Sequence, residues 1–158
     1  MDLVALEEIR ALKYRYLRSL DLKQWDEFAE TLAEDATGDY GSPSGGRPLQ
    51  FTSGAAIVEF MRTALSSNII TVHVCTHPVI EVEGETATGS WCLEDTVIVP
   101  DHGVQIRGAA YYRDRYRKDN GQWRITHTGY ERIYESTMSL SALPGFQLTA
   151  NRWAPAAT

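Results

Sequence analysis

Residues 69–83 (IITVHVCTHPVIEVE) and 85–99 (ETATGSWCLEDTVIV) form the stretch of sequence that decides the fold. Two further runs, 104–118 (VQIRGAAYYRDRYRK) and 122–135 (QWRITHTGYERIYE), have the same character. All four are rich in Val, Ile, Thr, Tyr and Trp, and their polar and apolar side chains alternate with a period of about two. This pattern is typical of β-strands. The sequence therefore predicts four long consecutive strands.

The links between these runs predict how the strands pair. Glu83-Gly84 and Asn120-Gly121 are dipeptides that suit tight hairpin turns, and residues 100–103 make the middle connection. Strands joined in this way run up and down in sequence. A sheet whose strands reach ~12–15 residues normally bends and coils.

Three segments upstream of the strands have helical spacing. Apolar side chains recur at steps of three and four across residues 3–20, and again from Trp25 to about Ala33. A third helix is predicted to begin after a cap at Thr52 or Ser53. Helices followed by a long meander predict an α+β fold, a cone-shaped α+β barrel in which three N-terminal helices pack on a curved, mostly antiparallel sheet.

Two connecting segments are less regular. Residues 36–52 hold a short predicted strand around Asp39–Tyr40 and a glycine-rich loop, which we interpret as a mobile flap. Residues 136–158 form a C-terminal tail after a single domain over residues 1–135. The curved sheet and the helices on its concave face are expected to enclose a pocket.

Composition excludes several classes of function. The 158 residues carry 15 Lys and Arg against 21 Asp and Glu, and the net charge of −6 disfavours nucleic acid and anionic membranes as partners. The chain has no apolar run near 18 residues and no signal-like start. Its His and Cys residues have no metal-binding spacing. We therefore expect a cytoplasmic protein with reduced thiols and no metal.

The predicted turns also set expected cross-strand pairs. A two-residue turn at Glu83-Gly84 would place Cys75 opposite Cys92, as two packed thiols. A turn at Asn120-Gly121 would place Asp114 opposite His127 and Tyr116 opposite Ile125. The Asp114–His127 pair is interpreted first as a structural or interface contact and second as a pair inside the pocket.

Three groups of residues carry a resemblance to a known family. The first helices contain Tyr-x-x-x-Leu-Asp-x-x-x-Trp (Tyr16, Leu20, Asp21, Trp25), the first long strand contains His73-x-x-x-His77-Pro78-x-Ile80, and the last two contain Tyr112-x-Asp114 and Gly121-x-Trp123-Arg124-Ile125. Over residues 5–135 the chain resembles SnoaL-like proteins of the nuclear transport factor 2-like superfamily. It is most similar to dehydratase-type members such as bile-acid dehydratase and scytalone dehydratase.

The resemblance implies a set of catalytic residues and an assembly. Tyr16, Asp21 and His73 match positions that meet in the cone of those enzymes. The resemblance also implies a homodimer or homotrimer and a tail that covers the pocket or the subunit interface. One departure is that the late-strand arginine of related sequences would fall near Thr128.

This set of residues can catalyse elimination of water beside a carbonyl without any cofactor. His73 would act as general base or acid, Asp21 would orient it, and Tyr16 would donate a hydrogen bond to a developing enolate oxygen. Each residue also has a structural interpretation, because Asp21 could cap the second helix with Gln24 three residues on, Tyr16 lies on an apolar stripe, and a strand histidine is often a core residue.

We therefore predict a lyase (dehydratase) or isomerase that acts on a hydrophobic hydroxy-carbonyl small molecule. The alternatives are a non-catalytic binding or scaffold protein of the same fold, and an accessory protein like the β-subunits of ring-hydroxylating dioxygenases. His77 shares strand parity with His73 unless Pro78 marks a bulge. The candidate substrate-binding residues are Trp25, Phe60, His77, Trp91, Tyr112 and His127.

Overall fold

The computed structural model describes residues 2–44, 47–66 and 68–154, and these residues form three helices, two before the first strand and one after the second strand. Helix α1 (Leu3–Asp21) begins at Asp2, whose carboxylate accepts the Ala5 N–H. Helix α2 (Trp25–Glu30) is short, and α3 (Gly54–Ala64) begins at Ser53, whose hydroxyl accepts the Ala56 N–H at 3.1 Å. The predicted cap of the third helix is therefore confirmed at Ser53.

Two expectations about the second helix are wrong. It ends at Glu30 instead of near Ala33, because residues from Leu32 onward enter a strand that pairs with the main sheet. Asp21 does not cap it either, since Asp21 is the last residue of α1 and the N-cap position of α2 is Gln24. The Asp21 carboxylate is thus available for contacts outside the helices.

Six strands form one sheet, in the order β2-β1-β6-β5-β4-β3. Their bounds are β1 Leu32–Ser44, β2 Arg47–Phe51, β3 Ile70–Glu83, β4 Thr86–Val99, β5 Val104–Asp119 and β6 Gln122–Ser139. The β1–β6 pair is parallel and the other neighbours are antiparallel. The sheet is curved but open, with β2 and β3 as its edges, so it is not a closed barrel.

The glycine-rich segment interpreted as a flap lies mostly in this sheet. Residues of β1 and β2 pair as a hairpin, and its tip at 45–46 lies outside the described residues. The short strand expected near Tyr40 is therefore part of a 13-residue strand. Two single turns of 3-10 helix, Pro100–His102 and Leu140–Ala142, follow β4 and β6.

The β5–β6 hairpin confirms its predicted turn, although a bulge changes the register further along. Asp119 lies opposite Gln122, and Tyr116 lies opposite Ile125 as expected. The bulge between Arg115 and Tyr116 then places Arg115 opposite His127. The expected Asp114–His127 pairing is therefore wrong, because one extra residue exchanges the two faces of a strand.

The β3–β4 hairpin turns one residue later than expected. Glu83 lies opposite Thr86, and the register shifts again where β3 bulges between Thr76 and Val79. Cys75 therefore lies opposite Leu93 instead of Cys92, and both cysteines are free thiols. Burial raises the pKa of the Cys75 thiol to about 12, which keeps it protonated.

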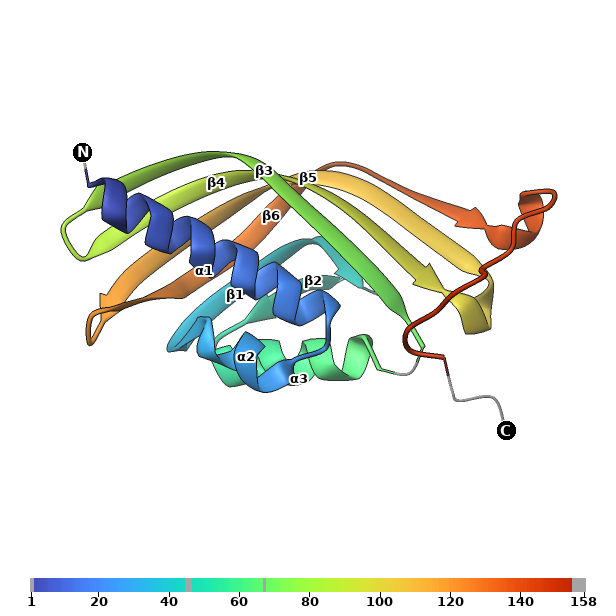
Figure 1. Ribbon diagram of the computed structural model, residues 1–158, viewed down its shortest axis with the longest axis horizontal. Helices are drawn as coiled ribbons and strands as arrows, with labels where there is room; N and C mark the ends of the chain where they lie inside the picture. Colours follow the sequence, from blue (N-terminus) through green and yellow to red (C-terminus); the bar gives the residue numbers. More distant parts are fainter. Residues whose placement is uncertain (1, 45–46, 67, 155–158) are drawn as a thin grey trace.

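All three helices lie under the arch of the sheet, and α1 crosses the long strands obliquely (Figure 1). We call the face beneath the helices the concave face and the opposite one the convex face. Large apolar side chains of α1 and of alternate strand positions pack together on the concave face, with Ile9, Tyr16, Trp91, Tyr116 and Ile125 almost fully buried. None of the described helices is long and apolar enough to cross a membrane.

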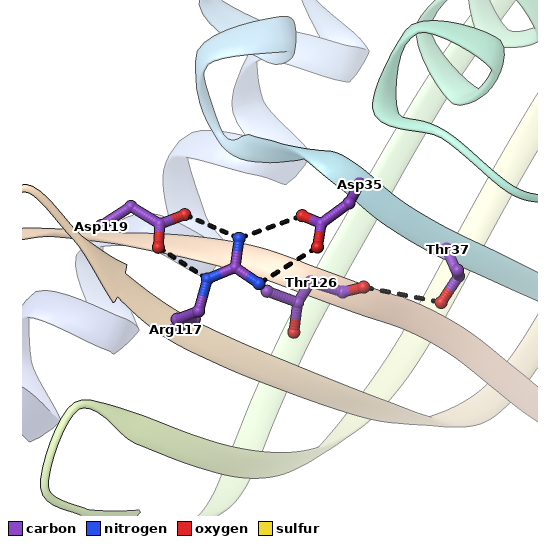
Figure 2. Close-up of polar contacts among 5 residues, drawn as sticks. All are labelled: Asp35, Thr37, Arg117, Asp119 and Thr126. Carbon is purple, nitrogen blue, oxygen red and sulfur yellow. Dashed lines mark hydrogen bonds and ion pairs between the residues drawn. The ribbon is translucent and has the colours of Figure 1, made fainter.

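Arg117 joins β1 to the end of the β5–β6 hairpin. Its guanidinium donates to both oxygens of Asp35 at 3.0 and 3.2 Å and to both oxygens of Asp119 at 2.6 and 3.0 Å (Figure 2). These ion pairs keep the pKa of both carboxyls below their usual range. Arg117 thus connects two strands that are far apart in the sequence.

Candidate functional site

The side chains of Asp21 and His73 are in direct contact at the end of α1. Asp21 Oδ1 lies 2.6 Å from His73 Nδ1 and accepts the Thr71 hydroxyl at 2.8 Å. Asp21 Oδ2 accepts the backbone N–H of His73 at 2.9 Å. The two side chains keep 19% and 13% of their surface exposed, so the pair is mostly buried but not sealed from solvent.

The local sequence explains this arrangement. Thr71 and His73 are two residues apart on β3, so both side chains point to the concave face where α1 ends. A carboxylate can only accept hydrogen bonds, so the proton between the two side chains lies on Nδ1 in the neutral ring. Nε2 of His73 then carries the lone pair, and among the described residues no protein group binds it.

A second ion pair lies beside this one on the concave face. Asp95 is directly opposite His73 in the β3–β4 register and is 6% exposed. Its carboxylate accepts from both terminal nitrogens of Arg132, at 2.5 and 3.1 Å. A Cβ at Gly108 would lie 2.4 Å from Arg132 Nη1, so the lack of a side chain at Gly108 leaves room for the guanidinium to cross β5 in this position.

Arg132 lies near the position where related sequences have a late-strand arginine that this chain lacks. Thr128, where related sequences suggest an arginine, is fully buried on β6, and Arg132 lies four residues further along the same strand. A basic group is therefore present in the row of His73 and Asp95. Asp95, Arg132 and Gly108 could not be predicted from the sequence, because they come together only through the registers of three strand pairs, β3–β4, β4–β5 and β5–β6.

Tyr16 lies deeper in the interior than Asp21. Its hydroxyl is 2.7 Å from that of Tyr40 and its ring packs on Phe28, with ring centroids 4.9 Å apart. Burial raises the pKa of Tyr16 above its usual range, and the hydrogen bond with Tyr40 lowers it by less. The hydroxyl is therefore a proton-bearing donor at neutral pH, and it bonds to Tyr40 instead of to a member of the Asp21–His73 pair.

A buried charged network occupies the next part of the interior. Lys13 Nζ lies 2.7 Å from Asp114 Oδ2, and both side chains are fully buried. The Tyr116 hydroxyl donates to Asp114 at 2.8 Å and accepts from Trp91 Nε1 at 2.9 Å. The ammonium of Lys13 also lies 3.3 Å from the ring centroid of Tyr112. Asp114 thus has an internal structural partner, which sequence analysis did not identify.

The position of Lys13 in the helix was a usable signal. It is four residues after Ile9 and three before Tyr16, so it falls on the buried stripe of α1. A lysine in such a stripe requires a buried carboxylate, because a lone buried charge is very costly. Trp91 and Tyr112 are buried in this interior, and their contact with a ligand stays a prediction.

The remaining candidates lie elsewhere. Trp25 borders a hollow of about 810 Å³ at the junction of α1, α2 and α3, and Phe60 packs on Phe51 with centroids 5.0 Å apart. His77 is exposed, with a φ of 51° in the β3 bulge, so it does not share the face of His73. The sequence left two possibilities for His77, a shared face with His73 or a bulge at Pro78, and the structure has the bulge.

His127 lies on the convex face, away from the dyad. Its Nδ1 is 2.7 Å from the Thr37 hydroxyl, which lies opposite it on β1. Burial and the nearby charge of Arg115 lower the pKa of His127 below its ordinary value. Among the described residues, no three His, Cys, Asp or Glu side chains converge in a way that could hold a metal ion.

Residues 1–129 match the family model of the SnoaL-like domain. The chain belongs to this family. As a SnoaL-like domain it shares its fold with many solved structures. One is a putative scytalone dehydratase from Novosphingobium aromaticivorans, at 18% identity over 85% of this chain and 88% of that one, with a TM-score of 0.76.

Two further structures show the range of proteins with this fold. A hexachlorocyclohexane dehydrochlorinase (LinA, type 2) has a TM-score of 0.77 and 18% identity, over 91% of this SnoaL-like domain and 97% of its own chain. An NTF2-like protein of unknown function from Pseudomonas putida has a TM-score of 0.68 and 20% identity, over 83% and 88% of the two chains. At these identities the likeness establishes the NTF2-like cone fold and not the reaction.

Proposed function

We propose that this SnoaL-like domain is a cofactor-independent lyase that eliminates water from a hydrophobic hydroxy-carbonyl compound. The observation that carries the proposal is the 2.6 Å contact between Asp21 and His73, which leaves Nε2 of His73 unbound by protein among the described residues. Dehydratase and dehydrochlorinase structures of the same fold support an elimination, although they do not specify its substrate.

In this proposal Nε2 of His73 removes the proton from the carbon next to the carbonyl. The electron pair of that C–H bond forms an enolate and then the new C=C bond. The hydroxyl on the neighbouring carbon leaves with its bonding electrons and takes the proton back from Nε2, so the products are an unsaturated carbonyl compound and water. Asp21 stabilises the imidazolium that exists between the two transfers. Return of the proton to a different carbon would make the same site an isomerase.

Two polar groups of the interior fit the rest of this reaction. Tyr16 keeps the donor role, with Tyr40 orienting its hydroxyl, because a protonated phenol can stabilise an enolate oxygen. The Arg132 guanidinium, held by Asp95 in the row of His73, is suited to a polar end of the substrate. The aromatic side chains around them favour a substrate with an apolar body.

A non-catalytic binding protein is the second candidate, and one observation favours it. Asp21 binds the backbone N–H of His73 and the hydroxyl of Thr71, both on edge strand β3. These contacts satisfy an unpaired edge group and hold α1 to the sheet, which is a structural role that requires no chemistry.

The distinguishing experiment measures enone formation by absorbance with a panel of apolar β-hydroxy ketones. We expect turnover by the native protein, and a loss of roughly 10²–10⁴-fold in His73→Ala and Asp21→Asn. His102→Ala is the matched control, because His102 is exposed on the turn between β4 and β5. Binding of ketones without turnover by the native protein would favour the second candidate. Unchanged turnover in His73→Ala would show that His73 is not the base.

We further propose that the chain assembles with copies of itself, as the resemblance implies, and that the contact surface is its convex face. Val72, Val74, Tyr111 and Tyr134 lie on this face in neighbouring rows and are each 46–51% exposed. We call these four residues the convex patch. Exposed apolar groups of this kind, gathered on one face, are typical of interaction surfaces. A stable heterologous chain in purified material would instead favour the accessory-subunit alternative.

A further inference from the structure

The C-terminal segment 151–153 returns to the part of the molecule that holds Asp21 and His73. After β6 and its 3-10 turn, the chain runs back toward the start of β3 (Figure 1). Asn151 Nδ2 donates to the carbonyl of Asn68 at 3.0 Å, and Asn151 Oδ1 accepts the Trp153 N–H at 2.9 Å. The ammonium of Lys23 lies 4.6 Å from the centroid of the Trp153 ring.

The two contacts of this segment are made with the two stretches of chain that carry the dyad. Lys23 is two residues after Asp21, and Asn68 is three residues before Thr71. Asp21 and Thr71 are already joined by the hydrogen bond between carboxylate and hydroxyl. The segment therefore makes a second connection between the same two stretches of chain, through its contacts with Lys23 and Asn68.

The residue type at position 23 is informative. The N–H of Gln24 donates to the carbonyl of Ser19 and that of Lys23 donates to Leu20, which are the two bonds of a Schellman motif at the end of α1. In this motif the residue with a left-handed conformation is usually glycine, because a Cβ is strained there. Lys23 has a φ of 54°, so its backbone is in this strained conformation. Its side chain makes a contact with Trp153 that glycine could not make.

We propose that residues 151–153 form a strap that positions the Asp21–His73 pair. Lys23, Asn68, Asn151 and Trp153 are its positioning residues. When the strap is docked, the turn after α1 and the start of β3 move together, so the carboxylate stays on the ring and amide of His73. This inference rests on the proposed function only for its effect on catalysis, because the geometry of the pair can be measured without any substrate.

The test uses Lys23→Gly in the full chain, followed by amide hydrogen exchange. This substitution relieves backbone strain at position 23, so it preserves the helix end while removing the contact with Trp153. The N–H of His73 reports directly on its bond to Asp21. The N–H of Ile125, which donates to Thr31, is an internal reference in the core.

We expect the His73 amide to exchange about tenfold faster in Lys23→Gly, while the Ile125 amide is unchanged. Trp153→Leu, which keeps apolar volume and removes the cation–π contact, should have the same effect. Arg152→Leu is the matched control, because the guanidinium of Arg152 contacts Trp153 within the segment and, among the described residues, joins it to no other part of the chain. It is expected to leave the exchange of His73 as in the native protein.

The strap is refuted if both variants increase the mobility of residues 151–153, measured by 15N relaxation, without faster exchange at His73. It is also refuted if the segment stays docked in both variants, because Lys23 and Trp153 would then not hold it. If His73 proves not to be a base, turnover will be insensitive to His73→Ala, whereas the exchange results will be unaffected. Failure of the proposed function and failure of the strap are therefore separate outcomes.

Discussion

Lys13 and Asp114 show at the scale of single residues how the interior tolerates charge. Their charged atoms are 2.7 Å apart and fully buried, and Tyr116 and Tyr112 complete the surroundings. Taking two charges out of water is costly, and their mutual attraction offsets that cost only while both are present. Each residue is therefore expected to depend on the other.

We predict that Lys13→Met lowers the free energy of unfolding by about 3–5 kcal/mol, because it leaves Asp114 charged and unpaired. The double variant Lys13→Met/Asp114→Asn should recover part of this loss. Urea unfolding followed by circular dichroism measures both. Arg113→Met is the matched control, since its ion pair with Glu131 is exposed, and it should change stability little. Equal losses in Lys13→Met and the double variant would contradict the predicted recovery.

At the scale of secondary-structure elements, the parallel pairing of β1 with β6 includes a histidine whose protonation can be tested. His127 and Thr37 join these strands by a side-chain contact of 2.7 Å. The pKa of His127 is lowered in the folded protein by burial and by Arg115. As pH falls below about 6.5, the unfolded chain therefore takes up this proton before the folded protein does.

The sign of the pH effect follows from this difference. The contribution of His127 to stability is fully present above pH ~6.5 and decreases as pH falls toward its lower folded pKa. We predict that His127→Asn shows a smaller loss of stability between pH 7.5 and 5.5 than the native protein, in urea titrations at each pH. Thr37→Val removes the partner but no titrating group, so it should lower stability at both pH values and keep the native loss. An identical pH dependence in native protein and His127→Asn would contradict the prediction.

Two bulges decide which residues the elements present to each face. In β3 the bulge moves His77 out of the row of His73, and in the β5–β6 hairpin another separates His127 from Asp114. Both act in the same way, because one extra residue in one strand reverses the alternation beyond it. The two bulges therefore determine which side chains of β3, β5 and β6 point to the concave face.

At the scale of the whole molecule, the arched sheet divides the surface into two parts with different roles. The concave face carries the dyad and the buried network, and the convex face carries the convex patch. If the chain associates through the convex patch, the site beneath the helices stays free for a small molecule. Assembly and ligand binding would then use opposite faces of one sheet.

If the chain forms the proposed homo-oligomer, we predict that Tyr111→Glu shifts it toward monomer, because burial of an unpaired charge opposes association. Sedimentation velocity at micromolar concentration measures the mass, and circular dichroism checks that the fold is kept. Val4→Glu is the matched control, since Val4 is a comparably exposed apolar residue on α1. A native protein that is monomeric, or a Tyr111→Glu variant that keeps the native mass, would contradict assembly through this patch.

Much of the fold could be predicted from the sequence because it depends on local signals. Strand alternation, the Asn120-Gly121 turn and the cap at Ser53 each involve residues within a few positions of one another. Local propensity and turn chemistry act over such distances. The long β1 strand was underestimated because its partner β6 lies some 90 residues away, and no local pattern records that pairing.

For the candidate site, the sequence by itself determined only which residue types were available: Asp21 at a helix end and His73 in an alternating strand. The tertiary structure decided that Asp21 binds His73 instead of capping α2, and that Asp95 and Arg132 lie beside them. It also decided that Asp114 pairs with Lys13 instead of His127. The physical reason is that such contacts depend on strand register, and a slip of one residue moves a side chain to the opposite face of the sheet.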